Sequence, residues 1–480
     1  MEVSVALKIS NTLSGVKEEF VPGGVKKQAI GEYSPVTMYS CGPTVYSYAH
    51  IGNFRTFMFN DLLRRYLKFR GFTVNHAMNI TDVDDKTIAG SQREGVTLRE
   101  YTEKYTNIFF EDLATLNIEP VEHNPRATES IGAMMDIIGR LNEKGIVYEK
   151  EGSLYFSISR FERYGRLSRL DMREVQSGLR YDTDEYEKDD VRDFALWKAA
   201  KDGEPFWETP FGRGRPGWHI ECSAMVRKIF GGTIDIHTGG VDLIFPHHEN
   251  EIAQSEAAYG EPFVRYWIHA EHLLVEGAKM SKSAGNFYTL RDLLEKGYSP
   301  RAIRYLLLSA HYRKQLNFTF EGLRQANAAL ERIDNLLARM GEITADGGES
   351  PDVTALASKA LEDFTAEMDD DLNISGALGR FFEFVHDVNT RITEGLLVCA
   401  DRDAILAALK KFDSVLGVVF FPAATGVDVD AERIDRLIEE RKNAKKDKNF
   451  ARADEIRALL EKEGIILEDT KDGTRWKRKK

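Results

Sequence analysis

The stretch LIFPHHENEIAQ, residues 243–254, carries two histidines and two glutamates within five positions. Imidazole nitrogens and carboxylate oxygens are common metal ligands, so the stretch predicts a metal site. Residues four apart share one face of a helix, so His247 and Glu251 can reach the same ion, whereas His248 and Glu249 then point elsewhere. The stretch is not the HExxH helix of a metalloprotease, because an isoleucine stands where that motif needs its second histidine.

Two cysteines extend this donor set. Zinc prefers thiolate and imidazole ligands and accepts carboxylate. Cys41 and Cys222 lie in the polar segments SCGPTVYSYAHIGN (40–53) and RPGWHIECSAM (215–225). An isolated cysteine is more often a small buried hydrophobic residue, and this is the interpretation for Cys399 inside the helical segment GLLVCA. The predicted ligand set for one zinc ion per chain is Cys41, Cys222, His247 and Glu251.

The segment that contains Cys41 also predicts a phosphate site. His50, Gly52 and Asn53 stand where a helix is expected to begin. A helix N-terminus offers unpaired N–H groups and the positive end of the helix dipole, which suit phosphate. Gly52 lets a ligand approach the backbone, and the side chains of His50 and Asn53 can donate hydrogen bonds to phosphoryl oxygens. On so short a match alone, a histidine near a helix cap is the commoner interpretation.

A second cationic motif lies in EGAKMSKSAGNF (276–287). Lys279 and Lys282 stand three apart among small and hydroxyl residues. A loop of this kind can fold over a triphosphate and neutralise the charge that develops on a leaving pyrophosphate. A solvated basic loop is the alternative, since lysine is common in loops.

Together these motifs resemble a known family. The His-Ile-Gly-Asn and Lys-Met-Ser-Lys-Ser segments resemble the signature pair of class I aminoacyl-tRNA synthetases. CGPTVY, RPGWHIECSAM and FPHHENEIAQS are similar to segments of the cysteinyl-tRNA synthetase family, and they occur in the family's order from about Tyr39 onward. The class signature usually ends in histidine where this chain has Asn53, which can donate a hydrogen bond but cannot carry a proton charge. The resemblance therefore implies a phosphate-binding role at residue 53 and no acid role.

The resemblance also implies roles for individual residues. It places zinc on the four ligands named above, and it implies that the substrate's thiolate adds to the zinc, which selects cysteine against serine. The residues expected to act on the phosphates are His50, Asn53, Lys279 and Lys282. The expected ATP-binding residues are Gly52, Gly240, Asp242 and Lys282, and the expected substrate-binding residues are Gly42, Thr44, Trp218 and His237. A core role for Trp218 is an equally good interpretation, and His237 and His248 can instead support the metal ligands.

The activity that the resemblance implies has two steps. L-Cysteine and ATP, with Mg²⁺, form cysteinyl-adenylate and pyrophosphate, and the cysteinyl group then passes to tRNA(Cys). A related ligase that transfers cysteine to an aminosugar would lack the long helical C-terminal region. A zinc metallohydrolase would need the missing histidine, and a non-catalytic RNA-binding paralogue would be expected to lose the two lysines of the phosphate loop.

The elements that must position these residues follow from the sequence pattern. Residues 36–41 and 72–80 are predicted strands, and the segment between them is a predicted helix that ends at Gly71. Strand, helix and strand within so short a length form a βαβ unit, which implies a parallel sheet with ligands at the carboxyl ends of its strands. TIDIH (233–237) is a further strand, TGGVD is a loop, and a helix is expected to begin near Pro246.

The fold class predicted is α/β, with three regions. A Rossmann-like catalytic domain spans residues 1–300, with a polar connective insertion at about 120–220. Amphipathic segments over 301–425 predict a helical bundle, and the resemblance implies that this bundle binds the tRNA stem and anticodon. Residues 430–480 are a small helical region with two charged helices and a basic tail.

The composition agrees with such a protein. The chain has 480 residues, a net charge of −12 and three cysteines. The sparse, odd cysteine count argues against a disulfide framework and favours a cytoplasmic location. No apolar run is long enough for a membrane span, and the N-terminus lacks a secretory pattern. An acidic chain can still bind nucleic acid through local basic segments such as 441–448 and 474–480. We expect a monomer.

Overall fold

The computed structural model describes residues 6–23, 35–169, 193–281, 285–421, 431–446, 449–462, 465–470 and 473–478. They belong to two compact units, Met1–Phe421 and Pro422–Lys480. Lys282, the charged segment 170–192 and most of the linker at 421–430 lie outside the described residues. Among the described helices, none combines the length and the apolar character that a membrane span requires.

A parallel sheet of four strands forms the centre of the first unit, in the order β11-β10-β3-β4. Every neighbouring pair is parallel. The strands are β3 (Val36–Ser40), β4 (Val74–Met78), β10 (Ile234–Gly240) and β11 (Val264–Ala270). All seven residues of β10 are buried, as expected for a parallel strand covered on both faces. The predicted βαβ unit and α/β class are confirmed, although Thr238–Gly240 belong to β10 and not to a loop.

Helix α1 (Ile51–Phe69) joins β3 to β4 and begins at the carboxyl edge of the sheet. His50 is its N-cap, and the chain leaves the helix through Gly71, whose φ of +86° suits glycine. Phe54, Met58 and Leu62 recur at helical spacing and are buried in the core. The helix is therefore held against the sheet with its N-terminus at the predicted phosphate site.

The insertion is more regular than its sequence suggests. It forms an antiparallel sheet of five strands in the order β5-β6-β7-β9-β8. The strands are β5 (Val147–Lys150), β6 (Ser153–Phe156), β7 (Phe194–Ala199), β8 (Trp207–Thr209) and β9 (Gly212–Pro216). The strands are too short for a clear alternation of polar and apolar residues, and β6 is separated from β7 by a long polar segment, so the pattern did not predict this sheet.

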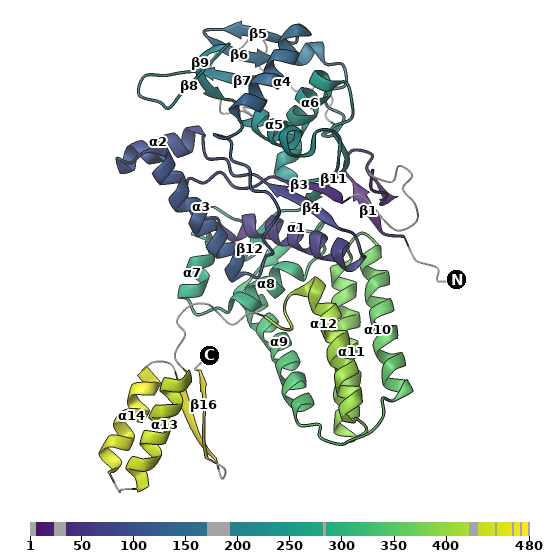
Figure 1. Ribbon diagram of the computed structural model, residues 1–480, viewed down its shortest axis with the longest axis vertical. Helices are drawn as coiled ribbons and strands as arrows, with labels where there is room; N and C mark the ends of the chain where they lie inside the picture. The colour runs from purple at the N-terminus through teal and green to yellow at the C-terminus, as the bar shows by residue number, and fades with distance from the viewer. Residues whose placement is uncertain are drawn as a thin grey trace. The chain divides into compact units, whose positions relative to one another are not determined.

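Helices and short strands complete the catalytic region. The helices are α2 (Asp85–Glu94), α3 (Leu98–Thr115), α4 (Ile131–Glu143), α5 (Trp218–Phe230), α6 (Glu249–Tyr259) and α7 (Leu290–Glu295). The strands are β1 (Lys8–Asn11), β2 (Val16–Glu19), β12 (Leu273–Val275), β13 (Ala278–Lys279) and β14 (Leu316–Phe318). Within this unit, Figure 1 shows the insertion on one side of the parallel sheet and the later helices on the other.

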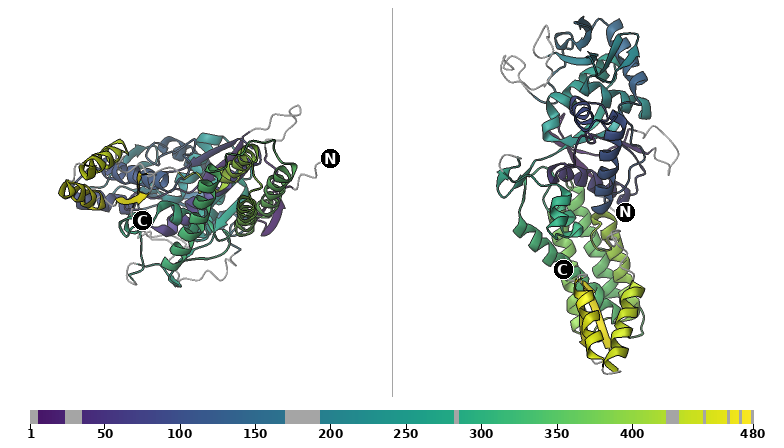
Figure 2. Two further views of the ribbon diagram at one scale, coloured as in Figure 1. Left: turned by 90° about the horizontal axis from the view of Figure 1, so that it is seen from below. Right: turned by 90° about the vertical axis from the view of Figure 1, so that its left-hand side faces the viewer.

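Those later helices confirm the predicted helical C-terminal region. They are α8 (Pro300–Leu308), α9 (Phe320–Gly341), α10 (Pro351–Asp369), α11 (Ile374–Thr393) and α12 (Cys399–Leu416). Helices α9 to α12 run side by side in Figures 1 and 2. Of the segment GLLVCA, only Cys399 and Ala400 are helical, because α12 begins at Cys399, and this cysteine is half-buried and not the buried residue that was expected. The proposed boundary near residue 300 stays a prediction, since both sides lie in one compact unit.

A buried ion pair joins the bundle to the catalytic region. Arg304 of α8 donates to the carboxylate of Asp61 on α1 over 2.7 Å. It also donates to the carbonyl oxygens of Leu416, over 2.9 Å, and of Leu116, over 3.0 Å. Burial would raise the pKa of Asp61, but the guanidinium of Arg304 holds it below its ordinary value. A buried charge with several such partners fixes the orientation of the helices that carry it.

The second unit contains α13 (Ala431–Lys446), α14 (Phe450–Lys462) and the antiparallel pair β15 (Ile465–Thr470) and β16 (Gly473–Arg478). The two charged helices agree with the sequence prediction. The region predicted as a basic tail contains this pair of strands, in which Thr470 lies opposite Gly473.

Candidate metal centre and nucleotide site

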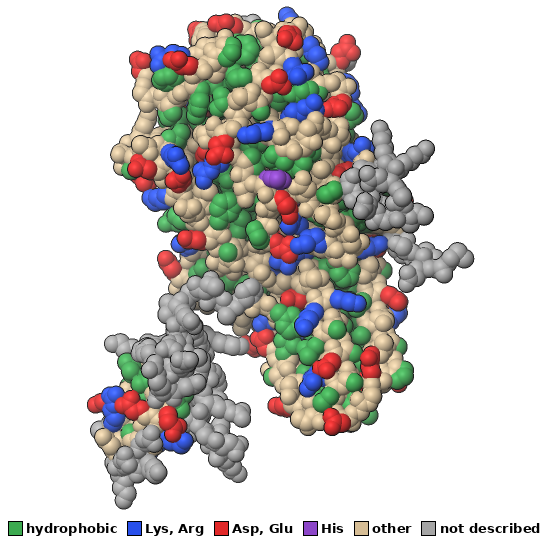
Figure 3. Space-filling model, viewed as in Figure 1, with side chains coloured by type: hydrophobic (Ala, Val, Ile, Leu, Met, Phe, Trp, Pro, Cys, Tyr) green, Lys and Arg blue, Asp and Glu red, His purple; other side chains and the backbone are tan. Residues whose placement is uncertain are grey.

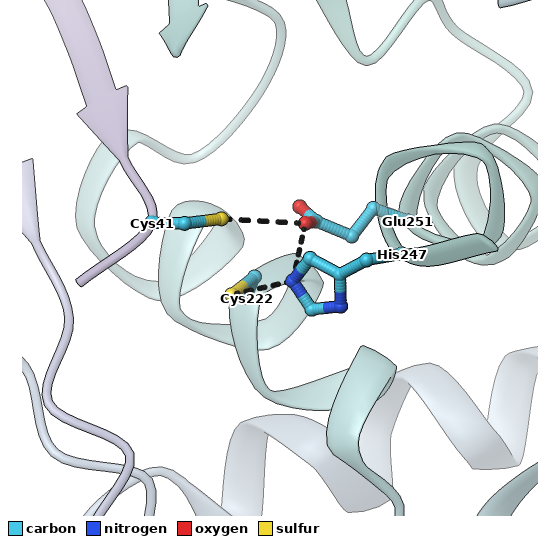
Figure 4. A group of neighbouring side chains, drawn as sticks. All are labelled: Cys41, Cys222, His247 and Glu251. Carbon is cyan, nitrogen blue, oxygen red and sulfur yellow. Dashed lines mark hydrogen bonds and ion pairs between the residues drawn. The ribbon is translucent and has the colours of Figure 1, made fainter. Parts of the chain in front are cut away.

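Four predicted metal ligands converge at the carboxyl edge of the parallel sheet. Cys41 follows β3, Cys222 lies on α5, His247 lies in the turn before α6, and Glu251 lies on α6. Figure 4 shows their donor atoms directed toward one another. One ligand atom from each residue lies within 4.8 Å of those of the other three, and all four residues are buried. Carboxyl ends of parallel strands meet at one edge, which brings these distant residues together.

The distances between these donors fit a metal ion. The Nε2 atom of His247 lies 3.0 Å from Oε1 of Glu251 and 3.6 Å from Sγ of Cys222. Sγ of Cys41 lies 3.9 Å from the same carboxylate oxygen. Tetrahedral zinc with ligand bonds of about 2.0–2.3 Å separates its ligands by about 3.3–3.8 Å. This buried cluster of two thiols, an imidazole and a carboxylate is therefore a candidate metal site, and only small movements of the side chains would be needed for all four to reach one ion.

The charge states in this cluster are also those of a cation site. Burial would lower the pKa of His247, but the carboxylate of Glu251 raises it to about 10. Burial would raise the pKa of Glu251, but the imidazoles of His237 and His247 lower it to about 2. A hydrogen bond with Cys41 lowers the pKa of Cys222 to about 6. The Glu251 carboxylate and the Cys222 thiolate then carry two negative charges against one positive charge on the His247 imidazolium, and a divalent cation can take the place of that proton.

His248 does not point away from the cluster, contrary to the sequence prediction. Its Nε2 atom lies 3.3 Å from Sγ of Cys41, and His237 contacts Glu251 over 3.0 Å. Cys41, His237, His248 and Glu251 therefore form a second candidate set that shares two members with the first. The turn before α6 is not a regular α-helix, since Phe245 has extended φ and ψ angles. His248 itself has helical φ and ψ angles and stands three residues before Glu251, a spacing that also shares one helix face, whereas the sequence prediction considered only the pair four residues apart.

Two further histidines, neither of them predicted from the sequence, hold the imidazoles of this centre. Nδ1 of His219 lies 2.9 Å from Nδ1 of His247, and Nε2 of His269 lies 2.7 Å from Nδ1 of His248. A partner on the second ring nitrogen orients a metal-binding histidine. His219 stands three residues before Cys222 on α5, and that spacing could have revealed it. His269, on β11, leaves no such signal.

The two expected substrate-binding aromatic residues lie on either side of this centre. The indole of Trp218 stacks on the ring of His247, with 4.2 Å between the ring centroids. Trp218 is 39% exposed, so it is not a core tryptophan. His237, on β10, is fully buried and contacts Glu251 of α6 and the ring of Trp267. Trp218 therefore borders an open side of the cluster, while His237 supports it from inside.

The two phosphate motifs meet at the N-terminus of α1. Nδ1 of His50 accepts a hydrogen bond from the backbone N–H of Asn53 over 3.1 Å, and the side-chain oxygen of Asn53 accepts one from the backbone N–H of His50. Since Nδ1 is an acceptor, the neutral imidazole carries its proton on Nε2 and can donate from there. The N–H of Ile51 donates to the carbonyl of Tyr288, and the ring of Phe287 packs on His50. The segment that follows the lysine motif is thereby attached to the first helical turn.

Gly52 lies where the first turn of α1 approaches the lysine motif, and a side chain at this position would meet both. A Cβ atom there would lie 3.0 Å from the His50 ring and 3.2 Å from Cε of Met280. Lys279, on β13, is exposed beside this junction, while Lys282 lies outside the described residues.

The glycine-rich end of β10 reaches the same helix. A Cβ atom at Gly240 would lie 2.3 Å from a carboxylate oxygen of Asp242 and 3.7 Å from the hydroxyl of Thr56 on α1. The expected ATP-binding residues Gly52, Gly240 and Asp242 thus lie along one side of α1. Their contact with ATP stays a prediction.

Gly42 and Thr44 make backbone contacts between the segments that follow β3 and β4. Thr44 forms a β-bridge with Thr81. The N–H of Gly42 donates to the side chain of Asn79 over 2.8 Å, and a Cβ atom at Gly42 would lie 1.7 Å from the Asn79 carbonyl oxygen. Close packing of the two segments that follow β3 and β4 therefore requires glycine at residue 42. This packing is a structural reason for glycine beside the expected role in substrate binding.

Gly42→Ala is expected to lower the free energy of unfolding by about 3 kcal/mol, because the new methyl group meets backbone that cannot move aside. Urea unfolding measures the change. Gly139→Ala is the matched control, since Gly139 lies within α4 and, among the described residues beyond its own helical turn, no atom comes within 4 Å of a Cβ atom placed there. That control should raise the free energy of unfolding by about 0.5–1 kcal/mol. Equal stability of Gly42→Ala and the parent protein would contradict the packing argument.

Glu249 has a structural role that the sequence did not predict. Its carboxylate accepts hydrogen bonds from the backbone N–H groups of Gly165, Leu167 and Ser168, over 2.8, 3.0 and 2.8 Å. It therefore points away from the metal cluster, as expected, and toward the insertion. Charge-assisted bonds to backbone N–H groups are among the stronger hydrogen bonds in proteins. Glu249 fixes the insertion to the helix that also carries Glu251.

Glu249→Gln is expected to loosen residues 165–168 without affecting metal binding, because it removes the charge of the acceptor and leaves the cluster intact. Amide hydrogen exchange at these residues should accelerate at least about tenfold. Glu251→Gln is the matched comparison, and it should lower the metal content of the purified protein while leaving exchange at 165–168 unchanged. Loss of metal in Glu249→Gln would show that the two glutamates do not have separate roles.

The parallel sheet, the helix N-terminus at its carboxyl edge and the lysine motif beside it define a class I aminoacyl-tRNA synthetase. Residues 28–328 match the family model described as the class I (C) tRNA synthetase catalytic domain, and residues 363–421 match the DALR domain. Among solved structures, Mycobacterium tuberculosis methionyl-tRNA synthetase in complex with methionyl-adenylate has a TM-score of 0.56 at 15% identity, over 80% of this chain and 90% of that one. Agrobacterium radiobacter LeuRS, in its tRNA-LeuAMS ternary complex, has a TM-score of 0.57 at 10% identity, over 84% and 86%. At these identities the likeness concerns the fold.

The curated relatives narrow the assignment. Cysteine–tRNA ligase of Leptospira interrogans is 50% identical over 486 residues, which covers 99% of this chain and 100% of the relative. That of Solibacter usitatus is 50% identical over 475 residues, with the same coverage. That of Chlamydia pneumoniae is 49% identical over 97% of both chains. This chain belongs to the cysteine–tRNA ligase family, and it is an enzyme of the class I synthetases.

Proposed function

We propose that this enzyme joins L-cysteine to tRNA(Cys) in two steps. Cysteine and ATP first form cysteinyl-adenylate and pyrophosphate, and the cysteinyl group then passes to the terminal adenosine of the tRNA. The observation that carries the proposal is the position of the buried Cys41, Cys222, His247 and Glu251 cluster at the same sheet edge as the N-terminus of α1. A thiol-binding centre and a phosphate-binding helix end are what cysteine and ATP require together.

The metal proposed for the cluster is Zn²⁺, held by Cys41, Cys222, His247 and Glu251. Bound there, zinc would supply a soft Lewis-acid site, for which a thiolate is a far better ligand than the hydroxyl of serine. We favour this set over the one with His237 and His248 because it uses both thiols. His219 and Trp218 hold the His247 ring in place, while His237 keeps the Glu251 carboxylate charged and oriented.

The other residues act by positioning and by charge stabilisation. The carboxylate of cysteine attacks the α-phosphate of ATP, so no side chain needs to act as a covalent nucleophile. His50 donates from Nε2 to a phosphoryl oxygen, Asn53 donates from its amide, and Lys279 and Lys282 neutralise charge on the leaving pyrophosphate. Mg²⁺ accompanies ATP, as it does in most nucleotide sites.

The same edge of the sheet holds the nucleoside and the amino acid. The backbone at Gly240 receives the adenosine, and Asp242 accepts from the ribose hydroxyls or from the ammonium of cysteine. Gly42, Thr44 and Trp218 border the amino-acid side. The helical bundle and the second unit contact the tRNA.

The alternatives fit less well. The general base of a zinc metallohydrolase would be Glu249, but its carboxylate is occupied by three backbone N–H groups of the insertion. A ligase that transfers cysteine to an aminosugar would not need the long helical region after residue 300.

Cysteine-dependent exchange of pyrophosphate into ATP tests the first step, and charging of tRNA(Cys) tests the second. We expect exchange with cysteine and none with equimolar serine, since serine lacks the thiolate. Charging should require tRNA with a terminal adenosine. Absence of exchange with cysteine, or equal exchange with serine, would overturn the proposed function.

A further inference from the structure

We propose that a cleft between α9 and α11 binds one nucleotide of the RNA, with its phosphate on two arginines and its base on an aromatic ring. This inference rests on the function proposed above and deepens it. The cleft has a volume of about 550 Å³, within the range of about 300–1,000 Å³ that is typical of small-ligand sites. Its lining residues are Arg332, Asn335, Ala338 and Arg339 of α9 and Phe382, Val385, His386 and Asn389 of α11.

The charge of this cleft favours an anion. Among the residues that the structure describes, no carboxylate forms an ion pair with Arg332 or Arg339. On α9, Glu321 pairs with Arg324, Asp334 pairs with Arg301, and Glu331 accepts from the amide of Asn327. On α11, Glu383 pairs with Arg380. Asp387 is next to His386 in sequence but does not line the cleft. On the face drawn in Figure 3, acidic and basic side chains are interspersed. Because the chain has a net charge of −12, its affinity for RNA has to come from local cationic sites such as this cleft.

One of these guanidinium groups is fixed in place by neutral partners. Arg339 donates to the side-chain oxygen of Asn389 over 2.7 Å and to the hydroxyl of Thr393 over 2.8 Å, both on α11. Neither partner cancels its charge, so the group is oriented but not neutralised. Arg332, seven residues earlier on the same helix, is exposed and lies on the same face. Two such groups on one wall of the cleft can bind the oxygens of a phosphate.

The other lining residues suit a nucleobase. The ring of Phe382 is half-buried and packs edge-on against Tyr305 at 6.2 Å, which fixes its orientation. A fixed aromatic face is a stacking surface for any base, worth roughly tenfold or more in affinity. Asn335 is exposed on α9 and supplies an amide group that can bond to a base edge. An acidic peptide would use the arginines but would leave the aromatic and amide groups without a function.

The test compares two glutamate substitutions on α9. Ala338 and Ala328 are both exposed on this helix, but only Ala338 lines the cleft. Ala338→Glu places a carboxylate beside the arginines and is expected to raise KM for tRNA(Cys) in charging at least tenfold. Ala328→Glu makes the same change in net charge and is expected to alter KM less than twofold. Arg332→Gln should raise KM about fivefold and reduce the slope of log Kd against log salt by about 0.7–0.9.

Pyrophosphate exchange separates this inference from the proposed function. All three variants should exchange pyrophosphate at the rate of the parent protein, because the cleft does not take part in cysteine activation. If the parent protein neither exchanges nor charges, the proposed function fails. If it does both, but Ala338→Glu and Ala328→Glu have the same KM for tRNA, the cleft is not a nucleotide site. An Arg332→Gln variant with an unchanged salt slope would overturn the phosphate contact.

Discussion

Cys222→Ser is expected to lower kcat/KM for cysteine-dependent pyrophosphate exchange by about 10³-fold, equivalent to about 4 kcal/mol of transition-state stabilisation. Serine is close in size but offers a hard hydroxyl in place of the thiolate whose pKa is about 6 in this cluster. The zinc content of the purified protein, measured by mass spectrometry of the metal, should fall in parallel. The parent protein treated with a chelator should lose exchange activity and regain it when Zn²⁺ is added.

Cys399→Ser is the matched control, because Cys399 is a half-buried free cysteine at the start of α12, outside the cluster. Its zinc content and exchange rate should equal those of the parent. His247→Asn and His248→Asn distinguish the two candidate ligand sets, and we expect the first to lose more zinc. Full exchange activity in Cys222→Ser would show that the cluster takes no part in cysteine activation.

His50→Ala and His50→Asn are both expected to lower the exchange rate by about 10²–10³-fold, because each removes the Nε2 donor from the start of α1. They should differ in stability. Asparagine is a good N-cap, so only the alanine variant should lose about 1 kcal/mol of unfolding free energy. Exchange kinetics and urea unfolding on the same samples separate the phosphate role of His50 from its capping role.

Thr319→Ala provides the control for capping alone. Thr319 is the N-cap of α9, where its hydroxyl accepts from the N–H of Gly322 over 2.8 Å. Its loss should cost about 1 kcal/mol of unfolding free energy and leave exchange unchanged. If His50→Asn exchanged pyrophosphate as fast as the parent, capping would be the whole role of His50.

The sequence by itself determined the features that depend on local spacing. The βαβ unit, the start of α1 at His50 and the i,i+4 pairing of His247 with Glu251 follow from short-range periodicity, which one segment specifies alone. The choice of Cys41 and Cys222 rested on ligand chemistry and on the resemblance to a family, not on spacing. The structure brings the Cys41 thiol and the Glu251 carboxylate to 3.9 Å although 210 positions separate them.

Only the tertiary structure decided which other groups face those residues. The contact of His248 with Cys41, the support from His269 and the clash that excludes a side chain at residue 42 all join segments far apart in the chain. The three bonds of Glu249 to the insertion and the arginine cleft between α9 and α11 are of the same kind. Such contacts arise from the packing of separate elements, and no periodicity within one segment encodes the orientation of a side chain in another.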